Sequence, residues 1–512
     1  MKNLFNRKFV AIVCGIATLI FAESCTKLTD NLSTDPVNIT NGDQVPATLL
    51  LSGVETSLVG VYEGEVARTA GIWCGYFAGD DRQYAGLQSY VTSGLDYDNE
   101  WVTIYTAIFK NTKSIKQKGR QAKNYTSVGV TQVIEAMAIS TAADLWGDVP
   151  YTEISRYPAL VTPKFDTQAS VYAAAQVLLD SAINNLALTG SVSAEDFFYS
   201  GDLTKWIAAA HTVKARIYLH TRDYVNAAAQ AALGISTSAG SMMAPHGDAY
   251  LQTFNLYYSF LTYDRPGYMA GNSFAPTMLD PTPNNPTPAN YKGNSKTNEN
   301  GRLNYFYAPY YNWQGLNTGY NYDVNVLWNP DWGTNPAYDG FFAGVKSFPI
   351  LTFEENQLIL AEATLKLNPT DLVTQQAAVD ILNTVRSYLN SGAQYGTSTR
   401  YITSAKVGQG FYQPYLLSDF DPGATANPNS LSADKAILTE ILKERYACFI
   451  GQIEGWNDMR RTHNFLSLPV TPGQSTYPKR ILYSQIEFNT NPNVPKSGVG
   501  LFDEVPAWTS AY

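Results

Sequence analysis

The chain has 512 residues and a formal net charge of −9 at pH 7, and charged residues make up only 15% of it. That length is sufficient for a large buried core, and the charge content lies below the roughly 25% usual for soluble domains. A nucleic-acid partner requires a basic surface, and no block of Lys or Arg supplies one, so we exclude nucleic-acid binding.

The first residues are typical of a secretory signal. Lys2, Arg7 and Lys8 precede the short apolar run VAIVCGIATLIFA, which ends at Ala22-Glu23-Ser24-Cys25. A small residue directly before a Cys at this place resembles a bacterial lipobox, in which the new N-terminal Cys is acylated. We predict a lipoprotein signal peptide over residues 1–24, lipidation of Cys25 and a polar tether over 25–45. The alternative is an ordinary signal peptide with an incidental Cys.

Residues 46–512 are predicted to form one mainly helical domain. Apolar side chains recur at helical spacing, and Ala occupies many crowded positions, which allows neighbouring helices to approach closely. We expect helices over about 131–145, from an N-cap at Asp166, over 203–221 and 224–234 with a turn at Arg222-Asp223, over 353–368 and 374–392 around Pro369, and over about 432–449. Consecutive helix pairs favour a tetratricopeptide-like scaffold that long insertions interrupt.

Two insertions, near residues 72–101 and 245–350, are not predicted to be helical. Both are rich in Tyr and Trp, and 305–332 reads YFYAPYYNWQGLNTGYNYDVNVLWNPDW. Aromatic rings can cover the apolar face of a sugar, and amide side chains can bind its hydroxyl groups. The candidate ligand-binding rings are Trp73, Tyr84, Tyr90, Trp101, Trp313, Tyr320, Trp328 and Trp332. The alternative is that these rings only pack the loops onto the scaffold.

Catalytic and metal-binding patterns are absent from the sequence. His211, His220, His246 and His463 show neither HExxH nor i, i+4 spacing, and the sequence contains no P-loop and no dinucleotide fingerprint. We therefore predict a protein without enzyme activity, cofactor or metal site. Cys74 and Cys448 are expected to be buried thiols, with a disulfide between them as the alternative.

The C-terminal part contains a distinctive set of motifs. The stretch ILKERYACFIGQIEGWNDMRRTHNF carries Glu444, Arg445, Glu454, Trp456, Asp458, Arg460 and Arg461, and it is followed by YPKR at 477–480 and by Glu487 to Asn489. Together with 136–153 and 358–367, these motifs resemble the SusD/RagB family of outer-membrane nutrient-binding lipoproteins of Bacteroidetes. Within them, a partly buried charge network that holds the last long helix is predicted for Glu444, Arg445, Asp458, Arg460 and Arg461.

The resemblance implies a tetratricopeptide-like scaffold with a loop-rich binding face. It also implies a lipid-anchored, cell-surface protein of the outer membrane that captures oligosaccharide and delivers it to a SusC-like TonB-dependent transporter. Three alternatives stay open: a peptide-binding member of the same family, an anchored hydrolase, and a lid whose rings only contact the transporter.

Overall fold

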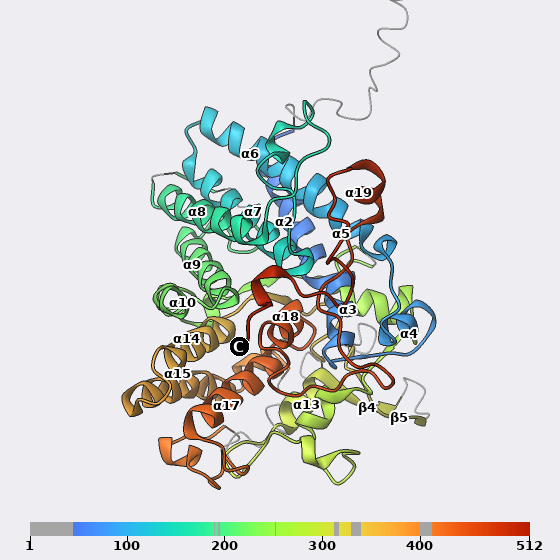
Figure 1. Cartoon of the computed structure of the whole chain (residues 1–512), viewed down its shortest axis with the longest axis vertical. Helices are drawn as coiled ribbons and strands as arrows, with labels where there is room; N and C mark the ends of the chain where they lie inside the picture. The colour runs from blue at the N-terminus through green and yellow to red at the C-terminus, as the bar shows by residue number, and fades with distance from the viewer. Residues whose placement is uncertain are drawn as a thin grey trace, which may run out of the picture.

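The computed structural model describes residues 45–188, 190–192, 195–250, 252–311, 317–328, 339–398 and 412–512. The described part is mainly helical, as predicted, and its long helices pack side by side in chain order (Figure 1). The array consists of α2 (Ala47–Glu63), α6 (Lys110–Gln121), α7 (Tyr125–Trp146), α8 (Gln168–Leu186), α9 (Leu203–His220), α10 (Tyr224–Ala231), α14 (Phe353–Leu367), α15 (Leu372–Ser391) and α17 (Ala433–Cys448).

Small residues set the close approach of neighbouring helices. A Cβ added at Gly129 of α7 would lie 2.8 Å from Leu186 Cγ and 3.0 Å from the Ala182 carbonyl oxygen of α8. Ala142 and Ala143 on α7 are completely buried. Larger side chains at these positions would push the two helices apart, so the Ala-rich pattern has the packing role that the sequence predicts.

The longer insertion leaves the helical array and returns to it through a two-stranded stem. β2 (Met242–Ala244) pairs with β6 (Phe348–Leu351) in antiparallel register, Met242 opposite Leu351. Because the stem closes the insertion, α10 packs directly on α14 although more than a hundred residues separate them in the chain. The array is therefore continuous in space and interrupted only in sequence.

The insertions contain more regular structure than the sequence predicts. Their elements are β1 (Ala78–Gly79), α4 (Arg82–Gln88), α5 (Asp98–Val102), α11 (Leu256–Ser259), β3 (Met269–Ala270), α12 (Phe274–Leu279), α13 (Asn300–Phe306), β4 (Tyr307–Tyr311) and β5 (Asn317–Val324). β1 pairs with β3, β3 contacts β5, and β4 pairs with β5. The two insertions thus join and lie on the same side of the molecule, at the right of Figure 1.

Several helix ends differ from the predictions. α7 begins at Tyr125 and not near residue 131, and α10 ends at Ala231 and not at 234. Thr167 caps α8 by accepting a hydrogen bond from the Ser170 amide, whereas Asp166 accepts bonds from the amides of Tyr151 and Thr152. The sequence prediction of an Asp166 cap is therefore wrong by one residue. After α17 the chain forms a separate helix, α18 (Ile453–Arg461), which packs against α3 (Glu65–Trp73); a short helix, α19 (Gln485–Thr490), follows near the end.

Residues 1–44, including Cys25, lie outside the described residues, so the predicted signal and anchor remain predictions. Among the described helices, none has both the length and the apolar character needed to cross a bilayer. Cys74 is buried and Cys448 is half-buried, and both are free thiols, so the predicted alternative of a disulfide is wrong.

Candidate functional site: an aromatic cluster on the joined insertions

Four of the predicted platform rings are core residues. Trp73, Tyr84, Tyr90 and Trp101 are 1%, 0%, 7% and 4% exposed. Their polar atoms are also occupied: the Trp73 indole donates to the Leu87 carbonyl, and the Tyr84 hydroxyl donates to Glu65. A ring without free surface cannot stack on a sugar, so the structure corrects the prediction for these four residues.

The other predicted rings belong to the longer insertion. Trp313 and Trp332 lie outside the described residues, and so does the side chain of Tyr320 on β5. Trp328 is described, and its ring is half-buried. In the quoted stretch 305–332, the first three rings, at 305–307, are buried and extend the core.

Trp328 belongs to a surface group of rings whose other four members are not among the predicted ones. We define the aromatic cluster as Tyr250, Phe254, Tyr258, Tyr263 and Trp328. The centroid of Phe254 lies 5.2 Å from that of Trp328, and Tyr258 lies 5.3 Å from it, both edge-on. The centroids of Tyr250 and Tyr263 lie 5.3 Å apart at an interplanar angle of 82°.

The cluster presents two rings to solvent, buries two others and leaves Trp328 half-buried. Tyr250 is 62% exposed and Tyr263 is 40% exposed, whereas Phe254 and Tyr258 are buried. Phe254 stacks parallel to Tyr263 at 6.1 Å and supports it from below. Because the two exposed rings are nearly perpendicular, one can stack on the apolar face of a sugar ring while the other contacts its edge.

The rings are fixed by the backbone around them. The side-chain oxygen of Asn255 caps α11 by accepting hydrogen bonds from the backbone amides of Tyr257 and Tyr258. The backbone N–H of Asn255 donates to the Gly344 carbonyl. Gly344 also leaves room for the indole, since a Cβ there would lie 2.7 Å from Trp328 Cε3 and 3.1 Å from Tyr258 Cδ1. The residues around the cluster therefore position it before any ligand arrives.

Replacing Gly344 by alanine is expected to displace the Trp328 ring, because the new Cβ would occupy its space. Such overpacking costs on the order of 1–3 kcal/mol of unfolding free energy. A shift of tryptophan fluorescence and a lower denaturation midpoint would show it. Gly53→Ala is the control, because a Cβ at Gly53 meets nothing within 4 Å. Equal midpoints for the two variants would contradict the tight seating of Trp328.

A polar rim connects the cluster to the shorter insertion. Arg265, two residues after Tyr263, lies over the Tyr268 ring at 5.8 Å, and Arg82 of α4 donates to the Tyr268 hydroxyl at 2.9 Å. Arg82 has a left-handed backbone with φ of +47°, a strained conformation that is common at functional sites. Burial raises the pKa of Asp323 to about 6, and the nearby Asp80 adds repulsion. Polar side chains of both insertions therefore meet at Tyr268, five residues after Tyr263 in the chain.

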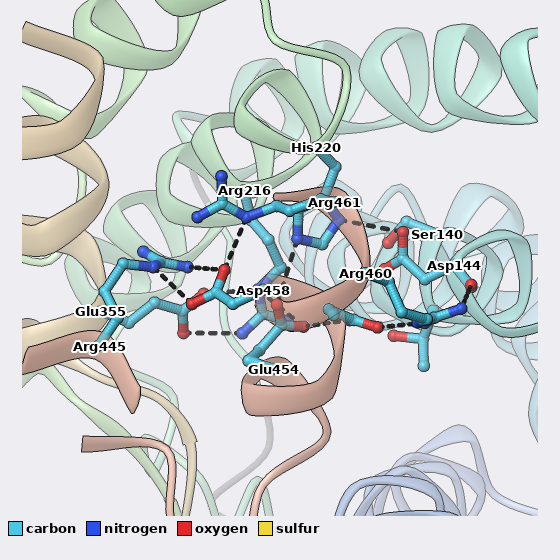
Figure 2. Close-up of polar contacts among 12 residues, drawn as sticks. Ser140, Asp144, Arg216, His220, Glu355, Arg445, Glu454, Asp458, Arg460 and Arg461 are labelled. Carbon is cyan, nitrogen blue, oxygen red and sulfur yellow. Dashed lines mark hydrogen bonds and ion pairs between the residues drawn. The ribbon is translucent and has the colours of Figure 1, made fainter. Parts of the chain in front are cut away.

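The motif residues at the C-terminal end form a buried charge cluster and no surface site. We define the charge cluster as Glu362, Arg445, Asp458 and Arg461. Arg461 donates to both Glu362 oxygens at 2.6 and 2.7 Å and to Asp458 at 2.6 Å, while Arg445 donates to Asp458 at 2.7 and 3.0 Å. These contacts connect α14, α17 and α18 and confirm the predicted structural role of Arg445, Asp458 and Arg461; Figure 2 shows these three side chains and their neighbours.

Glu444, the residue before Arg445, points to a different partner set. It accepts hydrogen bonds from Arg302 at 2.5 Å and from Lys292 at 2.9 Å, and both cations also bind Glu299. All four side chains are buried. The prediction placed Glu444 in one network with Arg445, whereas the structure uses it to fasten the longer insertion to α17.

A group of Asp144, His220 and Glu454 has the composition of a metal site, with ligand atoms within 4.8 Å of one another. The geometry indicates an ion-pair role. Asp144 lies 3.0 Å from Nδ1 of His220 and Glu454 lies 3.2 Å from Nε2, so the carboxylates hold opposite edges of the imidazole (Figure 2). Burial opposes a charge on His220, yet the two carboxylates raise its pKa to about 9. A protonated imidazole has no lone pair for a metal, so we assign the group a structural role.

Arg460 completes this region through packing and backbone contacts. Its guanidinium lies 3.6 Å from the Trp456 ring centroid and donates to the Asp144 carbonyl at 2.8 Å. The Trp456 indole donates to the Pro478 carbonyl and packs edge-on against Trp73. The motif residues therefore belong to the centre of the fold.

Comparisons with known proteins point to one family. A family model described as SusD-like, "Starch-binding associating with outer membrane", matches residues 38–484. A search of curated proteins finds no match. Solved structures share the fold at low identity: a SusD/RagB family protein from Bacteroides thetaiotaomicron is 21% identical over 91% of this chain and 98% of its own, with a TM-score of 0.62.

Two further structures resemble the chain to the same degree. A SusD homolog from Parabacteroides distasonis has a TM-score of 0.65 at 14% identity, over 91% of this chain and 99% of its own. A chitin-binding SusD homolog from Flavobacterium johnsoniae has a TM-score of 0.60 at 16% identity, over 90% and 98%.

Proposed function

The chain belongs to the SusD-like family, and from this membership and the aromatic cluster we propose that it is a glycan-binding protein of the outer membrane. In this proposal it captures oligosaccharides on the face of the joined insertions and delivers them to a SusC-like TonB-dependent transporter. Lipid attachment at Cys25 would hold it at the cell surface. The proposed activity is binding without turnover.

The observation that carries the glycan assignment is the pair of exposed, nearly perpendicular rings of Tyr250 and Tyr263 on a prearranged support. Each ring offers an apolar face, and Arg265, two residues after Tyr263, brings a guanidinium group to the same segment of the insertion. Carbohydrate needs this combination, because its C–H faces are weakly apolar while its hydroxyl groups seek hydrogen bonds. The family is described as starch-binding and one similar structure as chitin-binding, which supports this chemistry.

Removing both exposed rings is expected to weaken glycan binding at least tenfold while the fold stays intact. The double variant Tyr250→Ala/Tyr263→Ala deletes the stacking surface. A planar base stacked on an aromatic side chain contributes about 1–3 kcal/mol, and we take this as the scale for a stacked sugar ring. Calorimetric titration of the soluble form lacking residues 1–25 with starch and chitin oligosaccharides gives the affinities. Tyr157→Ala is the control, because Tyr157 is also exposed but belongs to the 3₁₀ turn region after α7 and not to the cluster.

Unchanged affinity in the double variant would contradict the proposed site, and no binding across a broad glycan panel would contradict the function. A peptide library tested beside the glycan panel separates the peptide-binding alternative, which would use backbone hydrogen bonds and apolar pockets. Mass spectrometry of the ligand after incubation separates the hydrolase alternative, because a binding protein leaves the oligosaccharide uncut.

A further inference from the structure

A second recess lies away from the aromatic cluster, between α2, α3 and the shorter insertion. It has a volume of about 750 Å³, within the range of roughly 300–1,000 Å³ typical of small-molecule sites. Its charged lining residues are Glu65, Arg68, Asp96 and Glu100. None of the five rings of the aromatic cluster lines it. We call it the acidic cavity.

The single cation of the acidic cavity is already engaged. Arg68 donates to Glu65 at 2.9 Å through Nη2 and to the Tyr84 hydroxyl at 2.9 Å through Nε. Its guanidinium also lies 4.4 Å from the centroid of the Phe260 ring. An anionic ligand would therefore find no unengaged cation among these lining residues and would lie against three carboxyl groups.

Glu100 is the second observation that indicates a ligand. Its side chain lines the cavity from α5 and is only 6% exposed, and its Oε2 atom has no hydrogen-bond partner among the described residues. A buried carboxyl oxygen without a partner costs free energy, so it is a strong attractor for a donor group. Burial raises the pKa of Glu100 to about 7, and Glu65 adds repulsion that Arg68 partly offsets. A cation placed between the carboxyl groups would relieve both effects.

The remaining lining adds short polar and apolar side chains. Thr69, Gln83 and Asn99 supply hydroxyl and amide groups, and Leu87 and Val91 supply apolar surface. We propose that the acidic cavity binds a small polar ligand through a protonated primary amine, carried either by an amino sugar or by an aliphatic diamine. The ammonium group lies between Glu65 and Glu100, and the rest of the ligand lies along the mixed lining.

Glycine positions on α2 allow a sharp test. Gly60 lines the cavity, and a Cβ there meets nothing within 4 Å, so Gly60→Leu adds a branched side chain at the cavity wall and leaves every carboxyl group of the lining in place. Gly53 lies on the same helix, is equally open and does not line the cavity. Gly53→Leu is therefore the matched control. Both substitutions replace a helical glycine by a good helix former, so neither is expected to lower stability.

The experiment is calorimetric titration with cadaverine, with the glucosamine disaccharide and with its N-acetylated counterpart. The protein is the soluble form carrying Tyr250→Ala/Tyr263→Ala, so that the aromatic cluster does not contribute. We expect at least one amine probe to bind, and the N-acetylated disaccharide, which has no charge, to bind at least tenfold more weakly than the free amine. Gly60→Leu and Glu100→Gln should each weaken amine binding at least tenfold, and Gly53→Leu should leave it unchanged.

Binding of the disaccharide alone would assign the amino sugar, and binding of cadaverine would assign the aliphatic amine. Absence of binding for both amine probes would overturn the proposal. Binding that Gly60→Leu does not weaken would overturn it too, even if Glu100→Gln proves unstable. Because the aromatic rings are removed in this protein, failure here leaves the proposed glycan function untouched, and failure of glycan binding elsewhere leaves this test valid.

Discussion

Replacing Arg461 by methionine is expected to lower the unfolding free energy by about 3–5 kcal/mol, because it leaves buried carboxylates without their partner. Arg461 is completely buried and makes three short hydrogen bonds, two to Glu362 and one to Asp458. Burial alone would raise the pKa of Glu362, but attraction to Arg461 and its hydrogen bonds hold it at about 2. Glu362 therefore stays ionised at neutral pH, and a methionine at position 461 provides neither a positive charge nor a hydrogen-bond donor for it.

Chemical denaturation of the soluble form measures this loss. Arg156→Met is the matched control, because Arg156 pairs with Glu153 at 3.4 Å on the surface, where an ion pair contributes at most about 1 kcal/mol. Adding Glu362→Gln to Arg461→Met should recover part of the loss, since the uncompensated charge disappears. Equal denaturation midpoints for Arg461→Met and Arg156→Met would show that the charge cluster does not hold α14 and α18 together.

The helical scaffold could be predicted because its causes are local. Apolar side chains at helical spacing and polar caps mark α9, α14 and α15, and the structure shows caps at Asp202, Thr352 and Asp371. The stem β2–β6 could not be predicted, because its two strands pair across more than a hundred residues. The short helices of the insertions were not predicted for a related reason. They depend on tertiary packing more than on their own periodicity.

It was harder to predict which aromatic rings are buried and which are exposed, because aromatic content alone does not distinguish a core residue from a surface residue. Trp73 stands between Ile72 and Cys74 in an apolar stretch, and it is buried. Tyr263 is followed by Asp-Arg-Pro-Gly, a charged turn that keeps the chain at the surface, and it is exposed. That local contrast is the signal that could have selected Tyr263 over Trp73. Nothing local marks Tyr250, whose neighbours in space come from later parts of the insertion.

The charge cluster and the longer insertion are connected through consecutive residues of one helix. Arg445 faces the charge cluster, and Glu444 faces Lys292 and Arg302 of the longer insertion. The same turn of α17 therefore holds both the centre of the scaffold and the base of the insertion that carries the aromatic cluster. A substitution at this turn would therefore disturb the scaffold and the longer insertion together.

Raising the pH from 6 to 9 is expected to remove up to about 3 kcal/mol of stability through His220 alone. Asp144 and Glu454 outweigh the effect of burial and raise the pKa of His220 from 6.5 to about 9. The folded state thus binds the proton more tightly than the unfolded state. The stabilisation is fully present below pH 6.5 and is lost as the pH rises through 9. Arg216, 3.6 Å from Glu454, stays charged throughout and does not replace the lost proton.

The comparison with His220→Gln isolates this effect, since other groups titrate in both proteins. At pH 6 the variant should be much less stable than the wild type, because two buried carboxylates lose their cation. As the pH rises to 9, the wild-type imidazole also loses its proton. The difference in unfolding free energy between the wild type and the variant should therefore narrow by up to about 3 kcal/mol. Denaturation midpoints at several pH values give this difference in stability. His463→Gln, at a partly exposed histidine, is the control. A stability difference that stays constant from pH 6 to 9 would mean that His220 has the same pKa in the folded and unfolded proteins, and the case against a metal between Asp144 and Glu454 would lose its main argument.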